Sequence, residues 1–180
     1  MFLKNTISGF RPMLELFKCA AFREILMPTL VVFAVCEKVI FDQRGGIPTL
    51  VSVLQGMQVV KKQGVPIPPD AVAPKPWVVF TWWKPHPADE GKSFRQWTEF
   101  YMPDGTVPPP GKQETTFTFV DESQRNAVES IGFPVGQEGI YKIKVWLESD
   151  SGEKVGEDHT YEIKLRYIDP PVEKSSEQMT

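Results

Sequence analysis

Apolar and polar residues alternate along residues 139–148 of this chain. Four apolar side chains lie on one face of the stretch, those of Tyr141, Ile143, Val145 and Leu147, and lysines and a tryptophan lie between them. A period of two is typical of a β-strand that has one face in the core and the other towards solvent. The alternation therefore predicts a half-buried strand here.

The residues at the start of this strand indicate where it belongs in a larger sheet. Gly139-Ile140-Tyr141 follows a loop that contains Pro134 and Gly136. A tyrosine in this position is typical of the tyrosine corner, which opens strand F of an immunoglobulin-type sandwich. We therefore interpret residues 139–148 as a strand F.

Similar alternating or apolar stretches recur along the chain, with turn residues between them. They predict strands at about 29–40, 48–60, 77–84, 93–102 and 113–120, and a last strand around 161–167. The first two would form an opening hairpin around Gly45-Gly46, and the proline-rich residues 61–76 an extended linker. Residues 123–135 are compatible with either a short strand or a turn of helix. This spacing predicts an all-β, immunoglobulin-like antiparallel β-sandwich of about 7–9 strands over residues 27–168.

The two ends of the chain are expected to lie outside the sandwich. Residues 1–26 carry apolar side chains at roughly helical spacing, with basic residues between them. We interpret this segment as a short helical or disordered N-terminal extension. Two alternatives stay open: translation could begin at Met27, or the segment could be a membrane-surface or transit helix. Residues 169–180 are polar and predict a disordered tail.

The order of these elements also resembles a known group of proteins. The features that match are the apolar first strand with Cys36-Glu37-Lys38-Val39, a glycine turn, the Leu50–Leu54 segment, the Pro103-Asp104-Gly105 turn and the late Gly-Ile-Tyr strand. Together they resemble a family of uncharacterised bacterial proteins with an immunoglobulin-like sandwich. The resemblance covers about residues 27–168. It implies the fold but no activity, because that family has no assigned catalytic residues.

Composition excludes several kinds of partner and location. The net charge of -3 provides no basic surface for nucleic acid, so we expect no nucleic-acid partner. No run of eighteen apolar residues is present, so we expect no integral membrane segment. The two cysteines, Cys19 and Cys36, lie too near the N-terminus to form an inter-sheet disulfide. Their use is typical of a reducing compartment, and we predict a cytoplasmic protein. A secreted sandwich without disulfides, which would look the same in sequence, is the alternative.

No constellation of residues typical of an enzyme is present. The chain lacks a glycine-rich phosphate loop, a nucleophile elbow and zinc-ligand spacing. Its two histidines, His86 and His159, are each interpreted as solvated, and Cys36 as an inert buried thiol. We therefore predict no catalytic residue, no cofactor and no metal ligand. A calcium site built from loop carboxylates is the alternative left open.

The aromatic residues are the strongest candidates for a binding site. If Val78, Phe80 and Trp82 face the core, Trp77 and Trp83 face outwards, because adjacent residues of a strand point to opposite faces. The same argument puts Phe94 and Phe100 on the core-facing side of the next strand, 93–102. Immunoglobulin topology would bring the strands 77–84 and 93–102 beside strand F. The predicted outer-face group is Trp77, Trp83, Trp97, Tyr101 and Trp146.

An exposed aromatic group of this size predicts a non-catalytic binding module. A protein partner is expected, including a second copy of the chain in a homodimer. An alternative is a small ligand, a carbohydrate or a nucleotide, stacked on the same aromatic face. A third interpretation is that loops or the N-terminal segment cover these rings.

Overall fold

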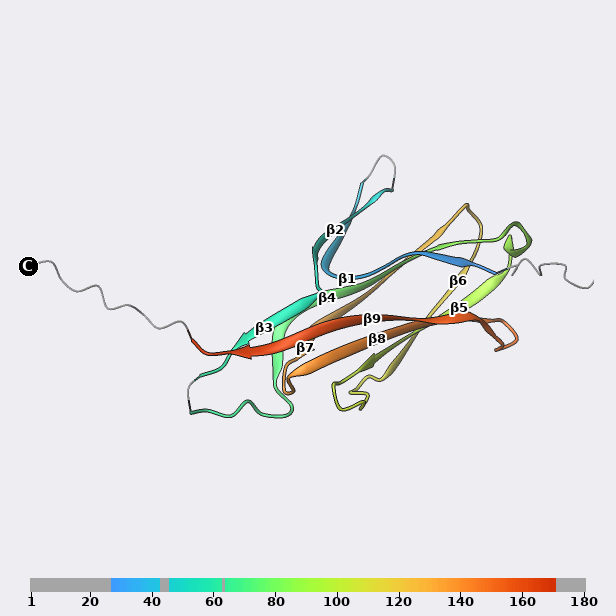
Figure 1. Ribbon diagram of the computed structural model, residues 1–180. Coiled ribbons are helices and arrows are strands. Elements are labelled where there is room, and N and C mark those ends of the chain that lie inside the picture. The colour runs from blue at the N-terminus through green and yellow to red at the C-terminus, as the bar shows by residue number, and fades with distance from the viewer. Residues whose placement is uncertain (1–26, 43–45, 63, 171–180) are drawn as a thin grey trace, which may run out of the picture.

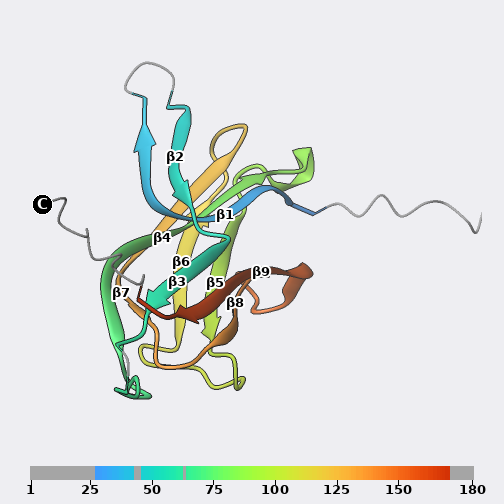
Figure 2. The ribbon, with the colours of Figure 1, turned by 60° about the vertical axis from the view of Figure 1, so that its left-hand side comes forward.

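The computed structural model describes residues 27–42, 46–62 and 64–170. Its strands form two sheets packed face to face (Figures 1 and 2). The first sheet has the strand order β2-β1-β4-β7, and all its pairs are antiparallel. These four strands are β1 (Thr29–Phe41), β2 (Pro48–Val53), β4 (Val72–Lys84) and β7 (Gln124–Pro134).

The second sheet has five strands in the order β3-β9-β8-β5-β6. Its strands are β3 (Gly56–Val60), β5 (Ser93–Tyr101), β6 (Lys112–Thr118), β8 (Gly139–Ser149) and β9 (Lys154–Ile168). All neighbours are antiparallel except β3, which runs parallel to β9. A short 3-10 helix, η1 (Pro87–Asp89), lies between β4 and β5.

The structure confirms the immunoglobulin-like β-sandwich, and the tyrosine corner supports this assignment directly. Tyr141 is fully buried at the start of β8, and its hydroxyl donates a hydrogen bond of 2.7 Å to the carbonyl of Gln137. Strands β5, β8 and β9 lie side by side, as strands C, F and G do in that fold. The ambiguous segment 123–135 is the strand β7.

The prediction of a single strand over residues 48–60 is wrong. Ser52 has a φ of 52°, and the chain then leaves the first sheet, with Leu54 donating its N–H to the Val35 carbonyl at 2.7 Å. β3 continues in the other sheet beside β9. A residue at Gly56 with a Cβ would approach the Lys164 carbonyl to 3.3 Å, so the absence of a side chain there favours the close pairing.

This change of sheet also corrects the predicted neighbours of the third strand. β4 pairs with β1 and β7, whereas the prediction placed it beside β5 and β8. Residues 48–53 form the predicted hairpin with the second half of β1, and β4, which pairs with the first half of β1, takes the place of strand B. It also begins at Val72, inside the segment expected to be a linker.

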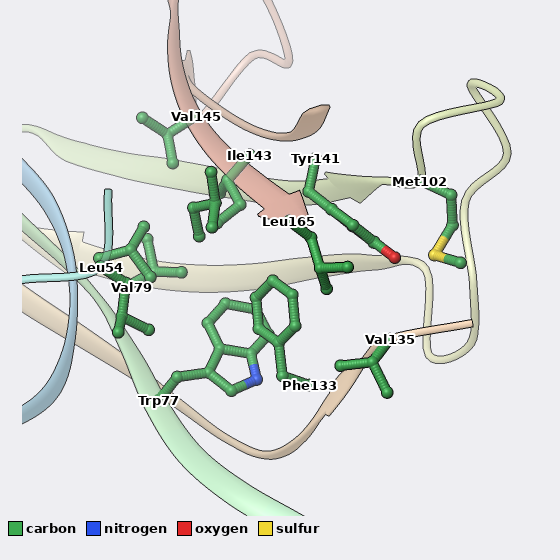
Figure 3. Close-up of a cluster of buried hydrophobic side chains, with 12 residues drawn as sticks. Leu54, Trp77, Val79, Met102, Phe133, Val135, Tyr141, Ile143, Val145 and Leu165 are labelled. Atoms are coloured by element: carbon green, nitrogen blue, oxygen red, sulfur yellow. The ribbon is translucent and has the colours of Figure 1, made fainter. Parts of the chain in front are cut away.

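Two clusters of apolar side chains fill the space between the sheets. In the larger cluster the Trp77 ring lies 5.7 Å from Phe133 and 5.5 Å from Phe100, with Tyr141 beside them (Figure 3). The smaller cluster lies near the other end and contains Trp83, Phe94, Phe117, Phe119 and Leu147. Both clusters depend on large aromatic rings, which contribute the most apolar area per residue.

A buried polar network connects the two sheets through one side chain, Gln96 of β5. Its Oε1 accepts hydrogen bonds from Thr81 Oγ1 at 2.7 Å, Trp83 Nε1 at 2.7 Å and Asn126 Nδ2 at 3.0 Å. An indole N–H can only donate, so the bond from Trp83 fixes which end of the Gln96 amide faces it. The network satisfies polar groups that would be costly to bury alone.

The outer side of the four-stranded sheet is partly covered by the β1–β2 hairpin. β1 pairs with β4 up to Cys36 and with β2 from Cys36 onwards, and the hairpin then rises from the sheet (Figures 1 and 2). Phe41 at its end contacts Phe80 with ring centroids 6.4 Å apart. Val78 and Phe80 are consequently buried although they point away from the inter-sheet core.

Both ends of the chain lie outside the residues that the structure describes. The predicted extension, residues 1–26, and residues 171–180 of the predicted tail lie outside the part that the structure describes. The expectations for these two segments therefore stay predictions.

The tyrosine corner leads to a prediction with a defined pH dependence. We expect Tyr141→Phe to lower the free energy of unfolding by about 1 kcal/mol at pH 8, because one hydrogen bond is lost. Burial raises the pKa of Tyr141 from 10.0 to about 12. A raised pKa means that the stabilisation by the neutral phenol is present below pH 10 and is lost as pH rises towards 12.

Urea unfolding of wild type and variant at pH 8 and near pH 11 tests this expectation. The difference between the two proteins should shrink at the higher pH, because only the wild type loses the contribution of Tyr141. A difference that is constant or grows would contradict it.

Candidate functional site

The outer face of the five-stranded sheet carries the aromatic residues that the fold leaves at the surface. Trp97 of β5 and Trp146 of β8 are directly opposite each other in the antiparallel pair, and Tyr101 lies further along β5. We call Trp97, Tyr101 and Trp146 the aromatic platform. All three are half-buried, and their neighbours along each strand point into the core, as the alternation of β5 and β8 predicts.

Two residues of the predicted group are not on this face. Trp77 and Trp83 keep 7% and 2% of their surface exposed and belong to the two core clusters. The Trp77 indole donates to the Gly132 carbonyl at 3.1 Å, and the Trp83 indole donates to Gln96. The prediction that they face outwards is therefore wrong.

The error has a clear physical cause. β4 is apolar on both faces, because one face contacts the other sheet and the opposite face lies under the β1–β2 hairpin. Its alternation therefore does not distinguish inside from outside. The signal that could have decided it is Gln96, an uncharged polar residue at an inward position of β5 that needs a buried donor such as an indole N–H.

Lysine ammonium groups lie over the rings of the platform. Lys112 Nζ is 3.6 Å from the centroid of the Trp97 ring and 4.7 Å from that of Trp146. Lys144 Nζ is 4.9 Å from the Tyr101 ring. Such cation–π contacts at exposed sites contribute about 0.5–1 kcal/mol each and hold the rings in place.

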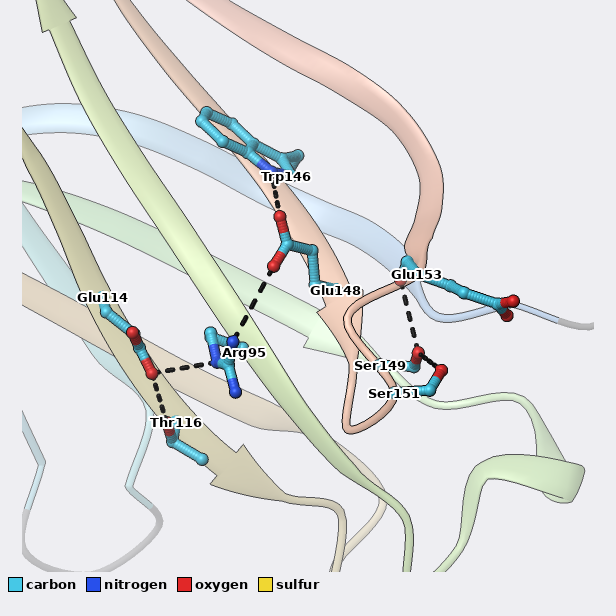
Figure 4. A network of polar contacts seen from close by, with 8 residues as sticks. All are labelled: Arg95, Glu114, Thr116, Trp146, Glu148, Ser149, Ser151 and Glu153. Carbon is cyan, nitrogen blue, oxygen red and sulfur yellow. Dashed lines mark hydrogen bonds and ion pairs between the residues drawn. The ribbon is translucent and has the colours of Figure 1, made fainter.

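An ion-pair network borders Trp146 (Figure 4). Arg95 lies between two carboxylates, with Nε 2.9 Å from Glu114 and Nη1 4.0 Å from Glu148. The Trp146 indole donates to Glu148 Oε1 at 3.3 Å. The charges alternate in sign, so this face carries no strong field of either sign.

Nearby polar and charged groups shift two pKa values on the face. The pKa of Glu148 lies below its ordinary value, first because of the adjacent Trp97 N–H and then because of Trp146, Lys112 and Arg95. The hydrogen bond of 2.5 Å from Tyr101 to Glu99, with burial and the nearby negative charge, raises the pKa of Tyr101 to about 12. The lowered pKa favours the ionised form of Glu148, and the raised pKa favours the neutral form of Tyr101. In both of these forms the polar contacts of the face are kept.

One donor on the platform is left open. Trp97 Nε1 approaches Glu148 but does not reach hydrogen-bond geometry with any acceptor of the described residues. Burying an indole N–H without a hydrogen-bond partner costs free energy. An acceptor on a binding partner that bonded to this N–H would remove that cost.

The remaining candidates for chemistry are placed as follows. Cys36 is fully buried, and burial raises the pKa of its thiol, so it stays protonated. The His86 side chain caps η1, and His159 lies half-buried with its ring 5.7 Å from Trp83. Within the described residues no three or more His, Cys, Asp or Glu side chains group as metal ligands would.

Comparison with known proteins adds little to this picture. No family model matches the chain, and no curated protein matches it. Among solved structures, a Bacteroides uniformis β-glucuronidase aligns over 52% of this chain and 12% of its own, with 14% identity and a TM-score of 0.42. The CARDB domain of a Pyrococcus furiosus protein, solved with two metal ions, aligns over 78% of this chain and 90% of its own, with 12% identity and a TM-score of 0.39.

The part of the chain that the structure describes has no helix with the length and apolar character needed to cross a bilayer.

The shifted carboxyl of Glu148 gives a prediction for the platform. In the folded protein we expect Glu148 to titrate below its ordinary pKa of 4.5, and Trp97→Phe to move the pKa back towards that value. A lowered pKa means that the associated stabilisation is present above pH 4.5 and is lost as pH falls through the folded-state pKa.

NMR titration of the side-chain carboxyl resonances measures this directly. Tyr101→Phe is the matched control, because it removes a polar group of the same face that does not contact Glu148. Equal shifts in both variants, or none in Trp97→Phe, would contradict the account.

Proposed function

We propose that this protein is a non-catalytic binding module that recognises a protein surface through the outer face of its five-stranded sheet. The observation that carries the proposal is the cross-strand pair of Trp97 and Trp146 with the open Trp97 N–H. Tryptophan is enriched at the energetic centres of interfaces, where it combines a large apolar area with one hydrogen-bond donor.

The dimensions of the face suit a protein partner. Five strands spaced about 4.8 Å apart span about 19 Å, and a strand of the length of β8 spans about 35 Å. The product, about 700 Å², is close to the 800 Å² or so that each partner contributes to a specific interface. The surrounding Lys112, Arg95 and Glu114 would form the polar rim.

The nature of the partner follows from the balance of charge. Beside the aromatic platform, three cations, Lys112, Lys144 and Arg95, lie among three carboxylates, Glu99, Glu114 and Glu148. A mixed rim suits a partner of mixed charge, including a second copy of this chain, and gives no preference for the polyanionic backbone of nucleic acid. Self-association as a homodimer is thus included in the proposal.

A small ligand on the same face is the weaker alternative. A carbohydrate or a nucleotide could stack on Trp97 and Trp146. The cavities beside Trp82 and beside Phe94 both lie away from this face, however, and small-molecule sites are usually concave. A cytoplasmic location and membership of the uncharacterised bacterial family belong to the same proposal.

The experiment compares wild type with the double variant Trp97→Ser/Trp146→Ser. Light scattering after size exclusion reports self-association, and quantitative affinity capture from the source cells reports other partners. We expect the double variant to weaken the association by about tenfold or more, because the central anchors are lost.

The matched control is Ile131→Ser, which removes an equally apolar residue, 91% exposed, from the other sheet. It should leave association unchanged. The proposal fails if wild type and double variant have the same mass and recover the same proteins while both are folded.

A further inference from the structure

A hollow in the described surface lies on the opposite side of the sandwich from the aromatic platform. It has a volume of about 1000 Å³ and lies at one end of the four-stranded sheet, on its outer side. Its walls come from the start of β1, the end of β4, the loop that carries η1 and the loop before β7. Its volume is at the upper limit of typical small-molecule sites, about 300–1,000 Å³.

The cavity has an aromatic wall that is held in position. Trp82 faces away from the inter-sheet core and is half-buried. The Arg125 guanidinium carbon lies 4.5 Å from the centroid of the Trp82 ring, and Arg125 Nη1 donates to the Gly46 carbonyl at 2.5 Å. The β1–β2 hairpin thus fixes Arg125, and Arg125 fixes the indole, before any ligand arrives.

Polar groups of both kinds surround this ring. Lys84, His86 and Arg125 are donors, and Glu90, Asp121 and Glu122 are acceptors. None of the ion pairs within the described residues involves any of these six. Arg125 Nε is shielded from solvent and has no hydrogen-bond partner. The charged groups of the lining therefore form no ion pairs with one another or with other described residues.

The helix cap defines how His86 can act. The Nδ1 atom of His86 accepts a hydrogen bond of 3.1 Å from the Ala88 N–H. The backbone N–H of His86 donates to the Asp89 carboxylate at 3.2 Å. Because Nδ1 accepts, the ring proton is on Nε2, which leaves that nitrogen as a donor. The cap also holds the imidazole in one orientation.

This lining excludes two kinds of ligand. Acidic side chains among the basic ones disfavour a phosphate or another anion. The carboxylates of the described residues are too dispersed to form a cation site of three or more ligands. A neutral ligand with many groups that both donate and accept is compatible with both sets of side chains.

We propose that this cavity binds a neutral saccharide, with one sugar ring packed against Trp82. The C–H groups of a pyranose match the electron-rich face of an indole. Its hydroxyls can donate to Glu90, Asp121 or Glu122 and accept from Lys84, His86 or Arg125. The volume admits a short oligosaccharide. This site lies on the other sheet and does not depend on the function proposed for the aromatic platform.

The test uses four trisaccharide probes, namely cellotriose, maltotriose, xylotriose and chitotriose. Saturation-transfer NMR detects binding, and calorimetry measures it. We expect at least one probe to bind with a Kd of about 1 mM or tighter. Trp82→Ala should weaken binding by about tenfold or more, and Asp121→Asn by about twofold to tenfold. The controls, Ile131→Ala and Asp150→Asn, lie outside the cavity and should bind as wild type does.

Several results would overturn the proposal. One is the absence of binding by all four probes at about 10 mM. Another is equal binding by Asp121→Asn and wild type, and a third is loss of binding in Ile131→Ala. Binding of inorganic phosphate or Ca²⁺ in place of the sugars would also refute a neutral ligand. If Trp82→Ala does not fold, Asp121→Asn and Glu122→Gln decide the matter, because both side chains are in an exposed loop.

Discussion

The hydrogen bond from the Trp83 indole to Gln96 determines which side of β4 faces the core. Gln96 is fully buried on β5, and its carbonyl oxygen needs donors from the opposite sheet. With Trp83 inside, the alternation of β4 puts Trp77 in the larger cluster and Trp82 on the outer side. The same bond therefore fixes which aromatic side chain of β4 lines the cavity on the outer side of this sheet. A shift of β4 by one residue would exchange its buried and outward-facing side chains.

Sequence periodicity predicts which side chains face the core where one face of a strand is polar. The alternation around Tyr141 predicts the tyrosine corner, and that of β5 predicts that Phe94 and Phe100 lie inside and that Trp97 lies outside. It failed for β4, whose apolar residues lie on both faces. It also failed at Ser52, where a positive φ in an ordinary residue ends β2 and sends the chain to the other sheet. Both failures come from tertiary contacts of the β1–β2 hairpin.

The two sheets offer different kinds of surface. The five-stranded sheet presents a flat face on which two opposed tryptophans lie among paired charges. The four-stranded sheet presents a hollow, because the η1 loop and the loop before β7 rise around Trp82. Flat aromatic faces suit macromolecular partners, and hollows suit small ligands. The two proposals thus assign separate roles to the two outer sides of one sandwich.

The most direct test of this account is a double-mutant cycle between Trp83 and Gln96. Trp83→Phe removes the indole N–H and keeps an aromatic ring, and Gln96→Leu removes the acceptor and keeps the volume. Urea unfolding of the four proteins gives the coupling free energy. The account predicts a coupling of about 1–3 kcal/mol, because the two groups satisfy each other in the core. Additive effects, within about 0.5 kcal/mol, would mean that this bond does not set the orientation of β4.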